Sequence, residues 1–247
     1  MMLDYNKDHN FYYCIFFFIV TDVDLSENLL TENVASFLSD AVRGLFENGV
    51  KITDSKIKRI LINNNPKIGR KGAKMLIKSL ANDIIEHLEL RNIGALVGTA
   101  NLISNYIRDP YVSWKYVDFG DNSFSRVGLN EIFWAMIQNK RIRILKLNEN
   151  KAGTKFCSTK DNLLSHGISV PQFLRYNVVL RELDLSYNAL STEAGLNILD
   201  ALIDNHTIKK ISLRGNVIED SIASVIPDLL RCNNVLEELD LGEYRNI

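Results

Sequence analysis

Cysteine, net charge and long apolar runs are all scarce in this chain. Only three cysteines occur among 247 residues, Cys14, Cys157 and Cys232, and they lie far apart. A disulfide framework needs paired cysteines at regular short spacing. The sequence therefore excludes a disulfide-stapled secreted scaffold and favours a reducing, cytoplasmic compartment.

Charge of one sign is also lacking. The chain has 29 basic and 30 acidic side chains, a formal net charge of −1. No global field draws such a chain toward nucleic acid or an anionic membrane surface. No basic stripe appears in the sequence, so we expect neither a nucleic-acid partner nor a membrane partner.

Sequence motifs for catalysis and metal binding are missing as well. The four histidines share no metal-ligand spacing with the cysteines. Neither the phosphate-binding G-x-x-x-x-G-K-[ST] motif nor the G-x-S-x-G nucleophile motif occurs. His87 and Glu89 could form a dyad on one strand face, and Lys155 could activate Cys157, but ordinary exposed and inert roles are favoured. We predict no catalytic residue, no metal site and no cofactor.

The longest apolar run is Phe11–Val20, FYYCIFFFIV. Its ten residues are about half of what a helix needs to cross a bilayer. A signal peptide is one alternative, but Lys7 is the only basic residue before the run and no small-residue cleavage site follows. A misassigned start is another. We favour an N-terminal segment at 1–19 that forms a buried strand or cap, ahead of a repeat domain at 20–247.

A repeated pattern fills that domain. The template L-x-x-L-x-L-x-x-N matches eight times, with intervals of 37, 28, 29, 28, 38, 28 and 28 residues between starts. The three leucine positions of the template hold an apolar residue in all eight copies. The asparagine position holds asparagine except at Ile93 and Tyr244. The first positions of the copies are Val20, Ile57, Ile85, Trp114, Ile142, Leu180, Ile208 and Leu236.

This pattern resembles that of leucine-rich-repeat proteins, and its period of 28 to 29 residues resembles the ribonuclease-inhibitor-like subclass. The resemblance implies an α/β solenoid: a parallel sheet on the concave side, helices outside, and seven full repeats with a truncated eighth. The L-x-L alternation agrees with a short half-buried strand, and the apolar spacing after it agrees with an amphipathic helix. Because the sequence stops directly after the eighth strand, we expect either a short cap or a continuation in a longer chain, and favour the latter.

Function is expected between the buried leucines, where strand side chains reach the concave surface. Acidic and basic strands alternate there, which fits a self-compensated solvated face or a binding surface for a partner with matching charges. Tyr116 and Tyr187 are the aromatic candidates to anchor a partner. The candidate partner-binding residues of the strands and their ends are Asp22, Asp24, Arg59, His87, Glu89, Arg91, Tyr116, Asp118, Lys146, Glu182, Asp184, Tyr187, Lys210 and Arg214.

Two insertions of about ten residues interrupt the period. The first lies near 47–56. The second, at 151–166, is expected to rise beside the concave face as a partner-contacting loop or as a tolerated flexible insertion. Its candidate contact residues are Lys151, Lys155 and Phe156.

We therefore predict a non-enzymatic scaffold, monomeric or part of a larger assembly, that binds a protein partner. One alternative is a GTPase activator of the Ran type, which would need an acidic tail that this sequence lacks. Another is the ligand-sensing repeat region of a larger receptor. Similar repeat proteins include actin cappers and axonemal subunits, so a cytoskeletal or ciliary setting stays open.

Overall fold

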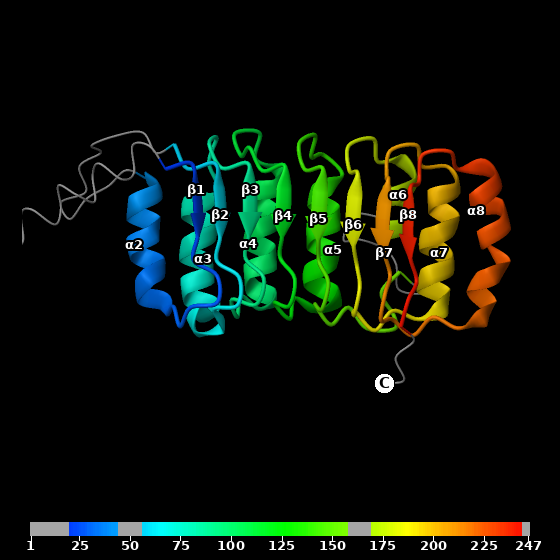
Figure 1. Ribbon diagram of the computed structural model, residues 1–247, viewed down its shortest axis with the longest axis horizontal. Helices are drawn as coiled ribbons and strands as arrows, with labels where there is room; N and C mark the ends of the chain where they lie inside the picture. The colour runs from blue at the N-terminus through cyan, green and yellow to red at the C-terminus, as the bar shows by residue number, and fades with distance from the viewer. Residues whose placement is uncertain (1–19, 44–55, 158–168, 244–247) are drawn as a thin grey trace, which may run out of the picture.

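Strands and helices alternate along the whole described chain. The structure is a computed structural model that describes residues 20–43, 56–157 and 169–243. Figure 1 shows the strands in one row, with the helices behind them. The strands are β1 (Asp22–Asp24), β2 (Arg59–Leu61), β3 (His87–Glu89), β4 (Tyr116–Asp118), β5 (Ile144–Lys146), β6 (Glu182–Asp184), β7 (Lys210–Ser212) and β8 (Glu238–Asp240). The helices are α2 (Glu32–Arg43), α3 (Gly69–Leu80), α4 (Val97–Arg108), α5 (Ser125–Met136), α6 (Val170–Tyr176), α7 (Thr192–Ile203) and α8 (Ile226–Cys232), with short 3₁₀ turns at Pro66–Ile68 and Asp220–Ser224.

The eight strands form one parallel sheet in sequence order. Equivalent residues pair throughout, so that Leu145 of β5 lies between Val117 of β4 and Leu183 of β6. Each repeat adds one strand and the next helix, and every strand lies beside the strand that precedes it in the sequence. The fold is a leucine-rich-repeat solenoid, as the sequence pattern predicts.

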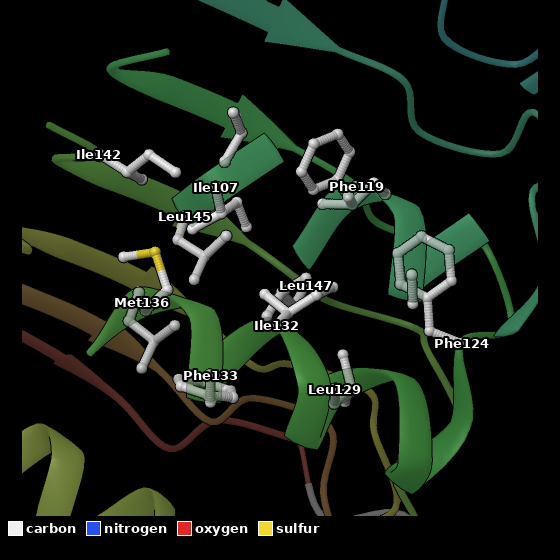
Figure 2. Packing of buried hydrophobic residues seen from close by; sticks show 14 of the residues in the cluster. Ile107, Phe119, Phe124, Leu129, Ile132, Phe133, Met136, Ile142, Leu145 and Leu147 are labelled. Carbon is white, nitrogen blue, oxygen red and sulfur yellow. The ribbon is translucent and has the colours of Figure 1, made fainter. Parts of the chain in front are cut away.

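The core lies between the sheet and the helices. The middle residue of every strand from β2 to β7 is at most 2% exposed. The first and third apolar positions of the template, which lie three residues before and two residues after it, are also buried. Figure 2 shows Phe133 and Met136 of α5 facing Leu145 and Ile142 of the β5 repeat. Burying a side chain of this size stabilises the fold by about 1.5–3 kcal/mol, which neither the strand nor the helix could obtain alone.

The turns that follow the strands form one edge of the sheet, which we call the strand-end rim. A ladder of asparagines joins these turns. Asn188 shows the pattern: its Nδ2 donates to the carbonyl oxygens of Leu147, Leu185 and Ser186, and its Oδ1 accepts from the backbone N–H of Asn150. The sequence predicted such bonds within a turn, and the structure extends them between repeats. The ladder members are Asn65, Asn122, Asn150, Asn188 and Asn216, all at most 2% exposed.

The residue before the asparagine position of the template has a left-handed backbone in all eight repeats, including those where asparagine itself is absent or exposed. Only one of the eight is glycine, although the left-handed region costs other residues energy. The φ angles lie between 50° and 66°. These residues are Glu27, Asn64, Asn92, Asp121, Glu149, Tyr187, Gly215 and Glu243.

A second asparagine ladder, which sequence reasoning missed, lies at the opposite rim. This strand-start rim consists of the loops that lead from a helix end into the next strand. Asn205 is typical: its Oδ1 accepts from the N–H groups of Thr207 and Ile208, and its Nδ2 donates to the carbonyl oxygens of Leu174 and Asn177. The signal was an asparagine three residues before the first apolar position, at 82, 139, 177, 205 and 233.

The ends of the described array are less buried than its middle. Val23 of β1 and Leu239 of β8 are half-buried, whereas their counterparts in β3 and β5 are fully buried. No helix within the described residues is long and apolar enough to span a membrane. The predictions for residues 1–19 and for the first insertion lie mainly outside the described residues.

Candidate functional site

The predicted concave positions do alternate with the buried ones. In β3, β5 and β6 the outer residues are half-buried while the middle residue is fully buried. Asp22, Asp24 and Arg59 are exposed at the first two strands. The other candidates on the sheet gather into two groups, one over β3–β5 and one over β5–β8.

An aromatic cluster covers β3–β5. The His87 ring stacks on the Tyr116 ring with centroids 3.9 Å apart and 7° between their planes. His87 Nε2 lies 2.6 Å from Glu89 Oε1, and the other Glu89 oxygen accepts a 2.8 Å hydrogen bond from Asn63. Lys146 Nζ lies 5.3 Å from the Tyr116 ring centroid. Five side chains from four neighbouring strands or strand ends thus hold one another in fixed positions.

Electrostatics in this cluster are shaped by partial burial. Burial raises the pKa of Tyr116 and of Asp118, which is only 7% exposed. Burial alone would lower the pKa of the Lys146 ammonium, but the Tyr116 hydroxyl and the carboxylates of Asp118 and Asp184 outweigh it and raise that pKa. Lys146 is therefore a firmly charged group at the centre of the strand face.

A shallow hollow of about 210 Å³ lies over β5–β8. The half-buried Ile144 lines it together with two cations and three carboxylates, and the lining also includes Leu183 and Ile211, whose side chains are buried in the core. The charges are partly paired sideways, since Lys210 Nζ lies 3.0 Å from Glu238. The charged lining residues are Lys146, Glu182, Asp184, Lys210 and Glu238. Sequence reading had placed these strands side by side, with Ile144 on the concave face, but could not detect the hollow.

Asp184 has a structural role that the sequence did not reveal. Its Oδ1 accepts hydrogen bonds from both the backbone N–H and the hydroxyl of Ser186, at 2.9 and 2.6 Å. Asp24, Asp118 and Asp240 accept from the N–H two residues later in the same way. Because an aspartate in this position closes the turn after its strand, charge reversal there would disturb folding as well as binding.

Tyr187 and Arg214 meet at the strand-end rim. The Tyr187 hydroxyl donates to Glu243 at 2.5 Å and accepts from Arg214 Nε at 3.1 Å, while Arg214 Nη2 pairs with Glu243 at 2.7 Å. Further along this rim, Arg91 pairs with Glu149. The aromatic anchor predicted at Tyr187 is therefore already engaged with residues of its own chain.

The second insertion is described only as far as Cys157. Lys151 and Lys155 are exposed. The expectation for Phe156 is wrong: it is 1% exposed and lies 6.0 Å from Phe133, ring centroid to ring centroid, so it packs in the core. Cys157 is also buried, and burial raises the pKa of its thiol well above the ordinary value, which opposes thiolate reactivity. Residues 158–166 of this insertion lie outside the described residues.

Catalytic and metal chemistry would need His, Cys, Asp or Glu side chains grouped around a reacting atom or an ion. Within residues 20–43, 56–157 and 169–243, no three His, Cys, Asp or Glu side chains are grouped to hold a metal ion. His87 and Glu89 do form a hydrogen-bonded pair, but Tyr116 covers one face of the imidazole ring. The surface can offer charges, hydrogen bonds and a small apolar floor to another molecule.

Comparison with known proteins supports the repeat assignment. No family model matches the sequence. Among curated proteins, the chain is 24% identical over 221 residues to the protein named NACHT, LRR and PYD domains-containing protein 14 of Mus musculus. The alignment covers 85% of this chain and 21% of that protein, so the chain spans about a fifth of the relative's length.

Proposed function

We propose that this repeat array is a non-enzymatic scaffold that binds a protein partner through its strand face. The hollow over β5–β8 carries the proposal, because it combines an apolar floor with carboxylates and ammonium groups that can orient a partner side chain. A concave surface with a few convergent polar groups is a typical binding site. The cluster of His87, Tyr116 and Lys146 beside it supplies rigid aromatic area, which is favourable for anchoring.

Glu182 is the sharpest residue for testing this proposal. It lines the hollow and, unlike Asp184, has no hydrogen bond to the turn of its own repeat among the described contacts. Glu182→Lys reverses one charge in the hollow while leaving the ladder and the turn intact. We expect affinity for the partner to fall at least about tenfold, a typical size for a desolvated interface charge.

The experiment compares proteins that co-purify with tagged wild type, Glu182→Lys and Glu219→Lys from native cells, followed by titration of the purified partner. Glu219 is exposed in the loop before α8, so it makes the same charge change away from the strand face. Loss from Glu182→Lys alone, with matching thermal midpoints, supports the strand face. Equal retention by both variants would remove it as the binding surface.

A second candidate is the repeat region of a larger receptor. The name of the mouse relative combines leucine-rich repeats with NACHT and PYD domains, and this chain matches about a fifth of that protein. An immunoblot with an antibody to the repeats measures the mass of the native protein: a band near 28.1 kDa opposes this candidate, and a much larger band supports it.

We also propose that the array belongs to the ribonuclease-inhibitor-like subclass, because of its repeat length, and that the protein lies in the cytoplasm, because cysteines are scarce.

A further inference from the structure

A row of charged residues lies along the strand-start rim, one residue before each strand from β2 to β8. The backbone links its members across the sheet: the N–H of Arg143 donates to the Lys115 carbonyl, that of Arg181 to the Arg143 carbonyl and that of Lys209 to the Arg181 carbonyl, each at 2.7 Å. The full row is Lys58, Glu86, Lys115, Arg143, Arg181, Lys209 and Glu237. Sequence reading found no basic stripe because it did not consider the position directly after the first apolar residue of each copy.

The charges at the two sides of this row are compensated, but those in its middle are not. Lys115 pairs with Glu86 at 2.8 Å, and Lys209 pairs with Glu237 at 2.5 Å. For Arg143 and Arg181, no carboxylate of the described residues lies within ion-pair distance. Each guanidinium instead donates to a backbone carbonyl of the following loop, Val179 at 3.4 Å and Thr207 at 3.2 Å.

Two uncompensated arginines side by side are electrostatically unfavourable. Neighbouring strands are about 4.8 Å apart at the backbone, and two guanidinium groups extending from adjacent strand starts repel one another. A guanidinium has five N–H donors, so most of the donors on each arginine stay available to a ligand. An anion placed between them would relieve the repulsion and accept bidentate hydrogen bonds.

The surroundings add further positive charge and exposed apolar surface. Lys140 and Arg141 are exposed in the loop before Arg143, and Arg141 donates to backbone carbonyls of the previous loop. Three large side chains of the adjoining loops and helix end are exposed on this rim: Tyr111 at 79%, Tyr176 at 76% and Val178 at 71%. The rim from β4 to β7 thus combines cations with apolar contacts, and Asp204, a carboxylate in its loops, is held 3.3 Å from Arg175.

We propose that this basic row, from Lys115 to Lys209, docks an acidic segment of a protein partner. The segment lies across the strand starts, its carboxylates on Arg143 and Arg181 and its apolar side chains on Tyr176 and Val178. A protein segment fits better than nucleic acid, because ion pairs end the row after about 14 Å and no continuous groove of cations follows a phosphate backbone. The surface is separate from the hollow over β5–β8, so it supplies a second contact beside the proposed strand-face function.

Fluorescence anisotropy with the full chain tests this proposal. The probe is a labelled peptide of about ten residues with alternating glutamate and leucine, long enough to cover the row. Its matched control has glutamine in place of glutamate, and a labelled DNA duplex is the third probe. We expect the acidic peptide to bind, with affinity falling steeply as salt rises, and the glutamine peptide to bind far more weakly.

Variants then locate the site. The double variant Arg143→Glu/Arg181→Glu should weaken acidic-peptide binding at least about tenfold. The control Lys67→Glu/Lys78→Glu changes net charge equally on exposed residues near and within α3, and should change binding less than about twofold. Circular dichroism and thermal melts check that both variants fold.

Three results would overturn the proposal: no binding of the acidic peptide, equal loss in both double variants, or binding of the DNA in preference to the peptide. Glu182→Lys separates this proposal from the strand-face function, because added positive charge beside Arg181 should not weaken binding of the acidic peptide on the rim. A protein that loses its cellular partner through Glu182→Lys but binds the acidic peptide normally has a strand-face site and a rim site that act independently.

Discussion

The two rims of the sheet solve the same backbone problem and differ in charge. Each rim carries a ladder of asparagines whose amides bridge neighbouring repeats, Asn188 on the strand-end rim and Asn205 on the strand-start rim being typical. Above the strand-end ladder lies a left-handed row that includes Glu27, Asp121, Glu149 and Glu243. Above the other lies the basic row of lysines and arginines.

This difference teaches that stability and recognition occupy separate positions within one repeat. The asparagines of the strand-end ladder, Asn177 and Asn205 are buried, and all of them hold the turns by hydrogen bonds, so their replacement disturbs the fold. The charged residues lie one position before the strand-end asparagines and four positions after the strand-start asparagines; they are half-buried or exposed, and can vary in sign between the rims without loss of the ladder. On the strand-end rim Arg91 pairs with Glu149 and Arg214 with Glu243, whereas Arg143 and Arg181 on the strand-start rim donate to backbone carbonyls instead.

Removal of one asparagine from each ladder gives the largest expected effect. Asn188→Ala leaves several buried backbone groups without partners and should lower the free energy of unfolding by about 3 kcal/mol. Asn139→Ala, on the strand-start rim, should cost about 1.5 kcal/mol, because Asn139 is half-buried and water can replace its bonds. Urea unfolding of both variants measures the difference. Equal losses would mean that the two ladders contribute alike.

Gly215→Ala tests the left-handed row of the strand-end rim. Gly215 has φ +66°, and a Cβ there would lie 2.1 Å from atoms of the Tyr187 ring. We expect a loss of about 2 kcal/mol, from backbone strain and this clash together. Gly153→Ala is the matched control: it has φ +81° with open space around the added Cβ, so only strain remains, about 1 kcal/mol.

Thermal and urea unfolding of the two glycine variants separate strain from clash. Adding Tyr187→Ala to Gly215→Ala removes the ring that the new methyl group meets, and should bring the added loss down toward that of Gly153→Ala. If the two single variants unfold alike, the contact between Tyr187 and Gly215 does not constrain this rim.

The sequence predicted the fold well because its signal repeats. Leucine periodicity and Asn188-type positions recur in register, so the sheet order and the strand-face candidates followed from spacing alone. Phe156 was misplaced because a residue in an insertion has no periodic neighbour to indicate whether it is buried. The pairing of Tyr187 with Glu243 and the turn role of Asp184 depend on side-chain directions, which spacing does not encode.

The smallest expected effect contrasts the acidic groups of the two rims by pH. The Glu86 carboxylate, paired with Lys115 on the strand-start rim, has a lowered pKa, chiefly through that hydrogen bond. Its contribution to stability is present above the unfolded pKa of about 4.3 and is lost as pH falls through the folded pKa. Because both partners are substantially exposed, Glu86→Gln should cost under about 1 kcal/mol at pH 7.

Asp118, where β4 ends at the opposite rim, should respond with the opposite sign. Burial raises its pKa, so its ionised form destabilises the fold above the folded pKa, and this cost disappears as pH falls to the unfolded value of about 3.9. Asp118→Asn keeps an oxygen to accept from the Gly120 N–H and should raise the unfolding midpoint slightly at pH 7, with the gain vanishing in acid. Thermal melts of both variants from neutral to acid pH measure the two slopes. If the change in unfolding midpoint varied with pH in the same direction for both variants, burial would not distinguish the two carboxylates. Opposite directions would show that an ion pair lowers the pKa of Glu86 and that burial raises the pKa of Asp118.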